Sequence, residues 1–265
     1  MAKITIDTLY NMKKNSEKIV MITAYDALFA KIFNDEVDMV LVGDSLNMSF
    51  GGHSETIGIS VDEMIYHAKA VKRGLTRPYL VVDMPFGSCA TPKMALKNCI
   101  KVYEKTGCDA VKIEGGKEFA DTVELLSKNG IAVMSHIGLR PQLSRFQGGY
   151  KVNGKSEEAA KILLEDALVL EKAGATMILI EGTISSVATK ITKTLKVPTI
   201  GIGAGSGCDG QVLVWSDAFG FFNDFKPKFV KRYLNGAKLV EDAVKEYSND
   251  VKNGKFPSSD FEYSE

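Results

Sequence analysis

Several short apolar runs in this chain end on an ionisable side chain. They read MVLVGDS, YLVVDMP, AVKIEGG, IAVMSHIG and MILIEGT. Buried strands more often end on glycine, asparagine or another turn-forming residue, so these endings need an explanation. In a parallel (β/α) barrel all strands end at one face, where catalytic residues from several strands converge. We therefore expect one pocket to collect the ionisable residues of these endings, namely Asp44, Asp83, Lys112, Glu114, His136 and Glu181.

Eight apolar segments alternate with helical patterns along the chain. The predicted strands are residues 18–24, 38–43, 79–83, 109–114, 131–135, 175–181, 197–202 and 211–215. No Pro/Ser-rich linker or low-complexity segment interrupts them, and such alternation is typical of one α/β domain. The pattern therefore predicts a single (β/α)8 TIM barrel domain over residues 1–265.

The helical segments between these strands have recognisable ends. Ser60 and Glu63 have the spacing of a capping box, and Thr91 followed by Pro92 begins the next helix. Residues 5–14 predict an extra N-terminal helix. The amphipathic tail from residue 227 predicts C-terminal helix, which packs either on its own barrel or on another subunit.

A doubly wound open sheet is the rival architecture, because it also places ligands at the carboxyl ends of its strands. Its phosphate-binding fingerprint, GxGxxG, follows the first strand and opens a helix. Here the glycine-rich run GIGAGSG at 201–207 follows the seventh predicted strand and lacks that order. The run is better explained as a tight loop at the barrel rim, where a phosphate-binding role stays open.

Composition and charge narrow the possible partners. The chain is 45% hydrophobic and 25% charged, and Lys+Arg and Asp+Glu both total 33. This balance gives no net field to recruit nucleic acid or a membrane, so we expect a small-molecule substrate and neither of those partners. The sequence has no signal-peptide core and no apolar stretch of spanning length, which predicts a cytoplasmic protein. The four cysteines form no CxxC or zinc pattern and are expected to be packed thiols.

Three carboxylates are expected along one arc of the barrel rim. Asp44 and Asp83 end neighbouring predicted strands, and Glu114 ends the next one. Like charges this close raise one another's pKa unless a cation lies among them. Oxygen ligands with few histidines suit Mg²⁺, which binds one or two carboxylates and fills its octahedron with water and substrate. The arc therefore predicts a magnesium site, although a helix cap or a loop ion pair is the alternative for each aspartate alone.

The other polar strand residues suggest roles around a substrate. Lys112 and Glu114 lie two residues apart on one strand, so their side chains point the same way. Either they pair with each other, or Lys112 binds a substrate carboxylate while Glu114 supports the metal. Ser45, next to the aspartate of the second strand, is a candidate donor to the same substrate. Glu181 is the candidate general base. His136 is the best histidine candidate for the pocket and a candidate substrate-binding residue, whereas the default for a lone histidine is a satisfied structural residue.

Eight ordered motifs run through nearly the whole chain. They are ITAYD (22–26), VGDSLNM (42–48), VDEMIYHAKAV (61–71), VVDMPFGS (81–88), VKIEGG (111–116), HIGLRPQ (136–142), PTIGIGAG (198–205) and DGQVLVWSDAFG (209–220). In these motifs the chain resembles the ketopantoate hydroxymethyltransferase family. The resemblance implies a (β/α)8 barrel assembled as a homodecamer, with one Mg²⁺ per subunit and 5,10-methylenetetrahydrofolate as co-substrate. The implied reaction transfers a hydroxymethyl group to 3-methyl-2-oxobutanoate and gives 2-dehydropantoate (ketopantoate) for pantothenate and coenzyme A biosynthesis.

The resemblance also implies roles for individual residues. Asp44, Asp83 and Glu114 match metal-associated carboxylates, Ser45, Asp83 and Lys112 match contacts to the keto acid, and Glu181 matches the proton acceptor. The chain departs from the common family pattern at Asn47, at Arg140 and in the GTISS segment after Glu181. These departures concern the loops on the pteridine side and leave the metal and base residues in place.

Two other functions fit parts of the pattern. A Mg²⁺-dependent C–C lyase or phosphonomutase related to phosphoenolpyruvate mutase and isocitrate lyase would use the same rim, but such lyases typically carry a cysteine motif such as KKCGH, which this chain lacks. A non-catalytic keto-acid-binding protein would bind the keto acid with Mg²⁺ and leave its C3 proton in place. The presence of Asp44, Asp83 and Glu181 favours hydroxymethyl transfer, and the GGHSET loop at 51–56 is a candidate lid that excludes water.

Overall fold

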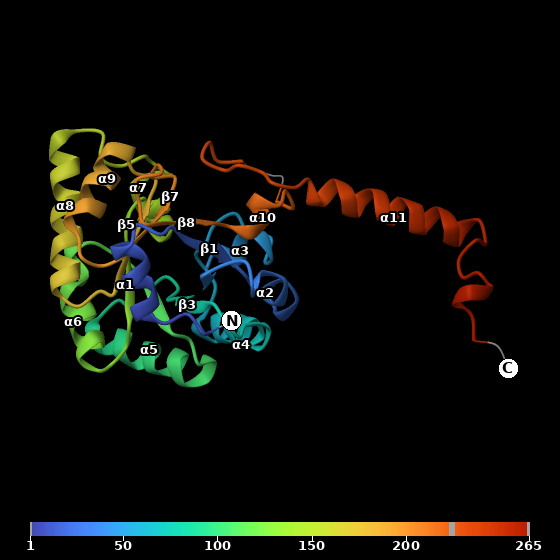
Figure 1. Cartoon of the computed structure of the whole chain (residues 1–265), viewed down its shortest axis with the longest axis horizontal. Coiled ribbons are helices and arrows are strands. Elements are labelled where there is room, and N and C mark those ends of the chain that lie inside the picture. The colour runs from blue at the N-terminus through green and yellow to red at the C-terminus, as the bar shows by residue number, and fades with distance from the viewer. Residues whose placement is uncertain (1, 223–225, 264–265) are drawn as a thin grey trace. The chain divides into compact units, whose positions relative to one another are not determined.

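Eight parallel strands close into a barrel in the order in which they occur along the chain (Figure 1). The computed structural model describes residues 2–222 and 226–263. The strands are β1 (Ile19–Thr23), β2 (Met39–Val42), β3 (Tyr79–Asp83), β4 (Ala110–Glu114), β5 (Val133–Gly138), β6 (Met177–Glu181), β7 (Thr199–Ile202) and β8 (Gly210–Leu213). Because β8 pairs with β1, the sheet has no free edge. The predicted (β/α)8 barrel is confirmed.

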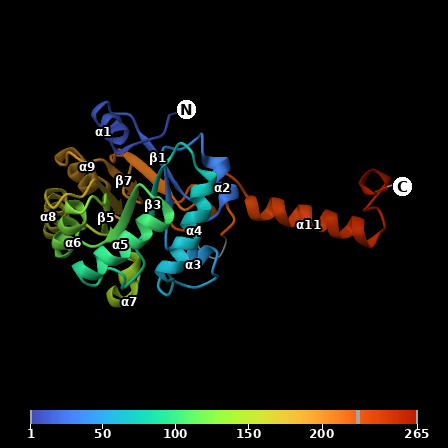
Figure 2. The same ribbon diagram turned by 90° about the horizontal axis from the view of Figure 1, so that it is seen from below.

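Helices that follow the strands surround the barrel (Figure 2). The longer ones are α2 (Ala27–Phe33), α4 (Val61–Gly74), α5 (Pro92–Thr106), α6 (Ala120–Lys128), α8 (Glu157–Lys172) and α9 (Ser185–Thr194). Short helical turns precede the main helix after β2, β4 and β5, namely α3 (Leu46–Ser49), η1 (Lys117–Phe119), η2 (Pro141–Leu143) and α7 (Ser144–Gln147). These longer connections lie at the carboxyl ends of the strands, where loops of such barrels build the site.

The helix ends follow from local sequence. The Ser60 side chain accepts the Glu63 N–H while the Glu63 carboxylate accepts the Ser60 N–H, so the predicted capping box forms. Thr91 caps the start of α5, and Gly107 ends it with a φ of 63°, a left-handed conformation that favours glycine. The predicted N-terminal helix is confirmed as α1 (Ile6–Lys14).

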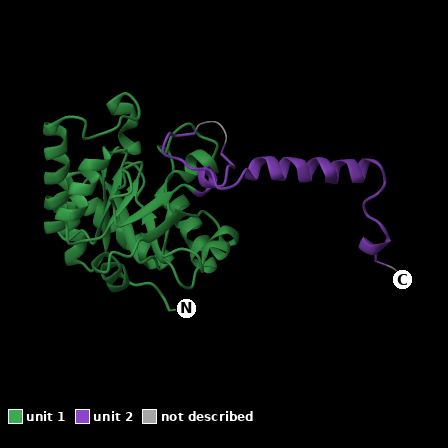
Figure 3. Ribbon diagram, turned by 45° about the horizontal axis from the view of Figure 1, so that its top comes forward, with its two compact units in different colours: residues 1–214 green, residues 215–265 purple. Residues whose placement is uncertain are grey.

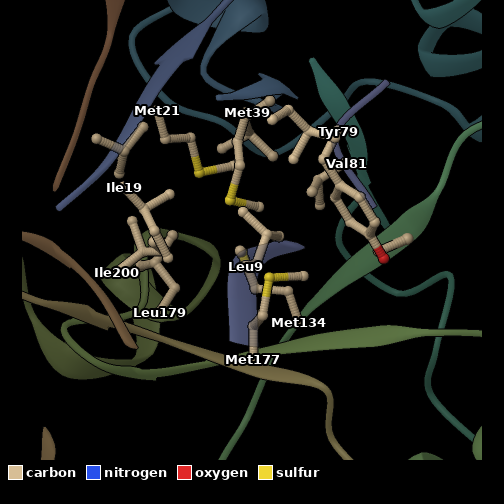
Figure 4. Packing of buried hydrophobic residues seen from close by; sticks show 14 of the residues in the cluster. Leu9, Ile19, Met21, Met39, Tyr79, Val81, Met134, Met177, Leu179 and Ile200 are labelled. Carbon is tan, nitrogen blue, oxygen red and sulfur yellow. The ribbon is translucent and has the colours of Figure 1, made fainter. Parts of the chain in front are cut away.

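Apolar side chains fill the end of the barrel where the strands begin (Figure 4). Met39, Tyr79 and Met177 are the first residues of their strands and are buried in one cluster. Leu9 of α1 packs into the same cluster, so the N-terminal helix covers this end of the barrel. Burial of each large apolar side chain contributes about 1.5–3 kcal/mol. The apolar core of the barrel therefore lies where the strands begin, and the ionisable residues lie where the strands end.

Two strands end more than one residue away from their predicted ends. Residues 131–135 were expected to form the fifth strand, whereas β5 runs from Val133 to Gly138, because pairing with β6 continues through Gly138. His136 consequently lies within a strand. The eighth strand was expected at 211–215 but ends at Leu213, since Trp215 begins the short helix α10 (Trp215–Ala218).

The chain forms two compact units, residues 1–214 and 215–265 (Figure 3). The first unit contains the barrel. The second contains α10, α11 (Gly236–Lys252) and the turn η3 (Ser259–Phe261), so the predicted C-terminal helices are present. The single-domain organisation and the packing partner of the tail stay predictions. Across the described residues, no helix is both long enough and apolar enough to cross a membrane.

Candidate active site

The predicted site residues gather where the strands end. Asp44 and Ser45 follow β2, Asp83 ends β3, Lys112 and Glu114 lie in β4, His136 lies in β5 and Glu181 ends β6. Cross-strand pairing places Asp83 beside Lys112 and Glu114 beside His136. Five of the ionisable residues are buried, namely Asp44, Asp83, Lys112, Glu114 and His136. Glu181 is partly accessible. The expected convergence of ionisable strand ends is therefore present in the structure.

The ammonium of Lys112 lies among the carboxylates. Its Nζ is 2.6 Å from Asp83 Oδ1, 3.8 Å from Glu114 Oε1 and 3.2 Å from His136 Nδ1. Burial lowers the pKa of Lys112, but the surrounding carboxylates outweigh burial and raise it above its ordinary value. A buried lysine is costly unless it is paired, and here the closest partner is Asp83. Lys112 is therefore a fixed positive charge inside the site.

Asp44 and Asp83 are held together against their mutual repulsion. The backbone N–H of Asp44 donates to Asp83 Oδ2 at 3.1 Å. Burial, followed by the charges of Asp83 and Glu114, raises the pKa of Asp44 well above its usual range. Burial also raises the pKa of Asp83, although Lys112 opposes the effect. Neighbouring buried carboxylates of this kind favour the binding of a cation.

The donor set suits a hard divalent cation. Asp83 Oδ1 is buried and, apart from its ion pair with Lys112, has no hydrogen-bond partner among the described residues. Within the same residues, no three His, Cys, Asp or Glu side chains form a ready ligand set, and Lys112 contacts both Asp83 and Glu114. Mg²⁺ needs only one or two protein carboxylates, so Asp44 and Asp83 fit it. The participation of Glu114 stays a prediction.

The ring of His136 bridges two carboxylates. Its Nδ1 lies 3.5 Å from Glu114 Oε1, and its Nε2 lies 3.4 Å from Glu181 Oε2. Burial and the charge of Lys112 lower the pKa of His136, but the two carboxylates raise it overall. Burial raises the pKa of Glu114, yet its contact with His136 brings that pKa below the usual value. His136 thus connects the buried acids to Glu181, the partly accessible acid.

Two residues that the sequence did not single out make further polar contacts in the site. Gln142 Nε2 donates to Asp44 Oδ2 at 2.8 Å, and the Gln142 backbone N–H donates to Glu114 Oε2 at 3.0 Å. The Tyr25 hydroxyl lies 2.8 Å from Ser45 Oγ. Tyr25 belongs to the ITAYD motif and Gln142 to the HIGLRPQ motif. Membership of these motifs is the signal that could have identified both residues.

Two loops that follow different strands are tied together by an ion pair. Arg145 Nε donates to Glu55 Oε2 at 2.8 Å, and the guanidinium makes a second bond to Glu55 Oε1. The side-chain amide of Asn47 donates to the backbone oxygen of Glu55, which holds the loop after β2. His53 is exposed in this loop. The candidate lid at 51–56 is therefore linked to the loop after β5, while its closing function stays a prediction.

Comparison with known proteins identifies the family. Residues 3–259 match the family profile described as ketopantoate hydroxymethyltransferase. The chain belongs to this family. A 3-methyl-2-oxobutanoate hydroxymethyltransferase from Campylobacter fetus subsp. fetus (strain 82-40) is 70% identical over 264 residues, which is 100% of both chains. The enzyme of the same name from Helicobacter pylori (strain Shi470) is 57% identical over 97% of this chain and 94% of its own length.

Solved structures with much lower identity share the fold. A phosphonopyruvate hydrolase, solved with oxalate and Mg²⁺, has a TM-score of 0.62 at 14% identity and covers 98% of this chain and 93% of its own. A phosphoenolpyruvate phosphomutase from Streptomyces platensis subsp. rosaceus has a TM-score of 0.61 at 15% identity, covering 94% and 88%. Identities this low show the barrel alone. Membership of the ketopantoate hydroxymethyltransferase family favours hydroxymethyl transfer over the lyase or mutase alternative.

The segments that depart from the common pattern of the ketopantoate hydroxymethyltransferase family have their own supports. After Glu181, the Thr183 hydroxyl donates to the Glu181 backbone oxygen at 2.9 Å, and Thr183 pairs with Asn153. Arg140 Nη1 lies 2.5 Å from Glu118 Oε1. Residues of the departing segments therefore make contacts of their own in the loops around the site.

Proposed function

We propose that this protein transfers a hydroxymethyl group from 5,10-methylenetetrahydrofolate to 3-methyl-2-oxobutanoate. The product is 2-dehydropantoate (ketopantoate), used for pantothenate and coenzyme A biosynthesis. The observation that carries the proposal is the 70% identity, over the full length of both chains, to a 3-methyl-2-oxobutanoate hydroxymethyltransferase. The connected buried acids, lysine and histidine support it, because one site then offers groups that bind an anion, bind a cation and accept a proton.

Lys112 and Ser45 bind the keto acid in this proposal. The Lys112 ammonium is kept charged by Asp83 and its neighbours, so it is ready to bind a substrate carboxylate. Ser45 donates a hydrogen bond to the same substrate, and the Tyr25 hydroxyl at 2.8 Å holds the serine in position. Asp44 and Asp83, with Glu114, hold one Mg²⁺ per subunit. When bound, the ion supplies Lewis-acid polarisation of the substrate ketone.

Glu181 removes the proton from C3 of the keto acid. Its side chain is 17% exposed, whereas Glu114 is 3% exposed, so Glu181 is the acid that a substrate can approach. His136 Nε2, 3.4 Å from Glu181 Oε2, limits the orientations of the carboxylate. The carbon that has lost its proton then forms a bond to the methylene carbon of the folate, and water supplies the hydroxyl oxygen of the product. Both carbon–nitrogen bonds of the methylene bridge break, and the proton from C3 and one proton of the water end on the two nitrogens of tetrahydrofolate. A positioned general base contributes roughly 10²–10⁴-fold to such a step.

The assembly implied by the family resemblance and the cytoplasmic location expected from the sequence are proposed together with the function. The chain forms a homodecamer in the cytoplasm. Support for the assembly comes from α11, which exposes an apolar row at helical spacing, as expected of a surface that contacts another subunit. The row consists of Val240, Val244, Tyr247 and Val251. Light scattering should give a particle of ten chains of 28.9 kDa each. A monomer at micromolar concentration would contradict the proposed assembly.

Isotope exchange followed by turnover tests the function. The protein, Mg²⁺ and 3-methyl-2-oxobutanoate are mixed in D₂O, and deuterium at C3 is followed by NMR. Methylenetetrahydrofolate is then added, and ketopantoate is measured. We expect exchange before the folate is added and product afterwards. Binding of the keto acid without exchange would indicate a silent binding protein, and exchange without product would indicate a different enzyme of 2-oxo acids.

A further inference from the structure

A cavity of about 230 Å³ lies among the loops that follow β3, β4 and β5. Glu114 and Gln142 line it on the side of the candidate active site, and Phe86, Phe119 and Arg140 line other parts of it. Pockets that enclose a whole drug-sized ligand usually measure about 300–1,000 Å³. The cavity is therefore suited to one ring system of a larger ligand.

Two aromatic rings give this cavity flat apolar surfaces. Phe86 is 52% exposed, so its ring is open to a ligand. The Phe119 ring lies directly against Gly115, where an added Cβ would be 2.1 Å from it, so only glycine allows the ring this position. Heterocyclic bases stack on such rings with a stabilisation of about 1–3 kcal/mol each. The walls therefore favour a planar heteroaromatic group.

A charged pair gives the cavity a polar edge. Arg140 Nη1 lies 2.5 Å from Glu118 Oε1, and the Gly116 N–H donates to the same oxygen at 3.1 Å. Among the described residues, Arg140 donates to Glu118 alone, which leaves most of its five N–H groups available. A carboxylate accepts from the amino and ring N–H groups of a 2-amino-4-oxo heterocycle, and a guanidinium donates to the oxo group. The pair thus matches both kinds of polar group on one ring edge.

We propose that this cavity binds the pteridine ring of the one-carbon donor, an inference that rests on the proposed function. Gln142 makes the connection between the two sites, because it lines the cavity and also donates to Asp44 Oδ2 at 2.8 Å. A ring held in the cavity thus lies against Glu114 and is separated from Asp44 by the side chain of Gln142. The nitrogen atoms that carry the one-carbon unit belong to this ring system or adjoin it. The rest of the donor, with its acidic tail, lies outside the cavity.

Affinity for tetrahydrofolate tests the assignment. Phe86→Ala removes a stacking surface and Arg140→Ala removes the donor, while Tyr66→Ala removes an aromatic side chain that is 71% exposed on α4 and serves as the matched control. Binding is measured by calorimetry in the presence of Mg²⁺ and keto acid. Each cavity variant should bind tetrahydrofolate about fivefold or more weakly than the wild type, and the control should not. C3 exchange without folate should be unchanged in all three variants.

Protection of Cys89 gives a second measurement on the unmodified protein. Cys89 lines the cavity and is 8% exposed, so a small alkylating reagent should label it slowly. Tetrahydrofolate should slow this labelling, as followed by peptide mass spectrometry. p-Aminobenzoylglutamate, which lacks the pteridine, should not protect Cys89. Equal protection by both compounds would overturn the assignment of the cavity to the pteridine.

The exchange assay separates failure of this inference from failure of the proposed function. If the wild type exchanges C3 and forms ketopantoate but both cavity variants keep their affinity for tetrahydrofolate, the cavity assignment alone is overturned. If the wild type neither exchanges C3 nor forms ketopantoate, the proposed function fails, and the inference fails with it.

Discussion

Replacement of Lys112 by methionine tests whether one ammonium holds the acids of the site together. Lys112 is 4% exposed, and its Nζ lies 2.6 Å from Asp83 Oδ1 and 3.8 Å from Glu114 Oε1. Methionine fills similar space but leaves the buried carboxylates without this charge. Breaking a buried ion pair by removing one partner costs about 3–5 kcal/mol. At about 2–4 °C per kcal/mol for a domain of this size range, the thermal midpoint should fall by roughly 6–20 °C.

Thermal unfolding followed by circular dichroism, with and without Mg²⁺, measures the effect of losing Lys112. A cation that binds only the folded state stabilises it, so Mg²⁺ should restore part of the midpoint that the variant loses. Lys117→Met is the matched control, because Lys117 pairs with Glu165 on the surface and should matter little. A Lys112→Met midpoint equal to that of the control would refute the reasoning.

Three further substitutions test the surroundings of the site and the second unit. Gln142→Leu removes the donor 2.8 Å from Asp44 Oδ2 and should lower the free energy of unfolding in urea by about 1.5–3 kcal/mol; an unchanged value would contradict this. Gly138→Ala places a Cβ 2.2 Å from the backbone oxygen of the proposed base, at a φ of 92°, so both the thermal midpoint and C3 exchange should fall, and wild-type exchange would show that the base is positioned in another way. Burial raises the pKa of Asp217 from 3.8 to about 6, although the charge of Arg232 opposes the shift. The folded state therefore binds the Asp217 proton more tightly than the unfolded state, and the protein loses stability as the pH rises from about 4 to about 6. Asp217→Asn should remove that loss, giving a larger gain in urea midpoint at about pH 7.5 than at about pH 4.5, and an equal gain at both would argue against it.

The barrel could be predicted because the sequence marks each strand in two ways, by an apolar run and by the start of the next helix. The third strand was predicted at 79–83 and is observed at Tyr79–Asp83. The fifth was predicted to end at 135 and continues to Gly138. Ser135 and His136 have the polarity of a strand end, but their hydrogen-bonded neighbours in β6 extend the strand. The local sequence pattern therefore predicts that a strand is present. It does not fix the residue at which the strand ends, because pairing with the neighbouring strand decides that.

The gathering of the polar residues could also be predicted, whereas their pairing could not. Lys112 contacts Asp83 because the register of β3 against β4 places these two residues opposite each other. That register depends on closure of the whole barrel. Gln142 reaches Asp44 from 98 residues further along the chain. No local pattern encodes a contact across such a separation, so the contact between Gln142 and Asp44 became visible only in the fold.

The role of Glu181 is the central claim, and the rate of C3 deuteration in Glu181→Gln tests it most directly. The glutamine keeps the size of the side chain but cannot accept the proton as a carboxylate does. Wild type and variant are compared in D₂O with Mg²⁺ at equal occupancy by 3-methyl-2-oxobutanoate. Exchange should fall by about 100-fold or more while binding of the keto acid is retained. Exchange at the wild-type rate in a variant that still binds the keto acid would contradict the account.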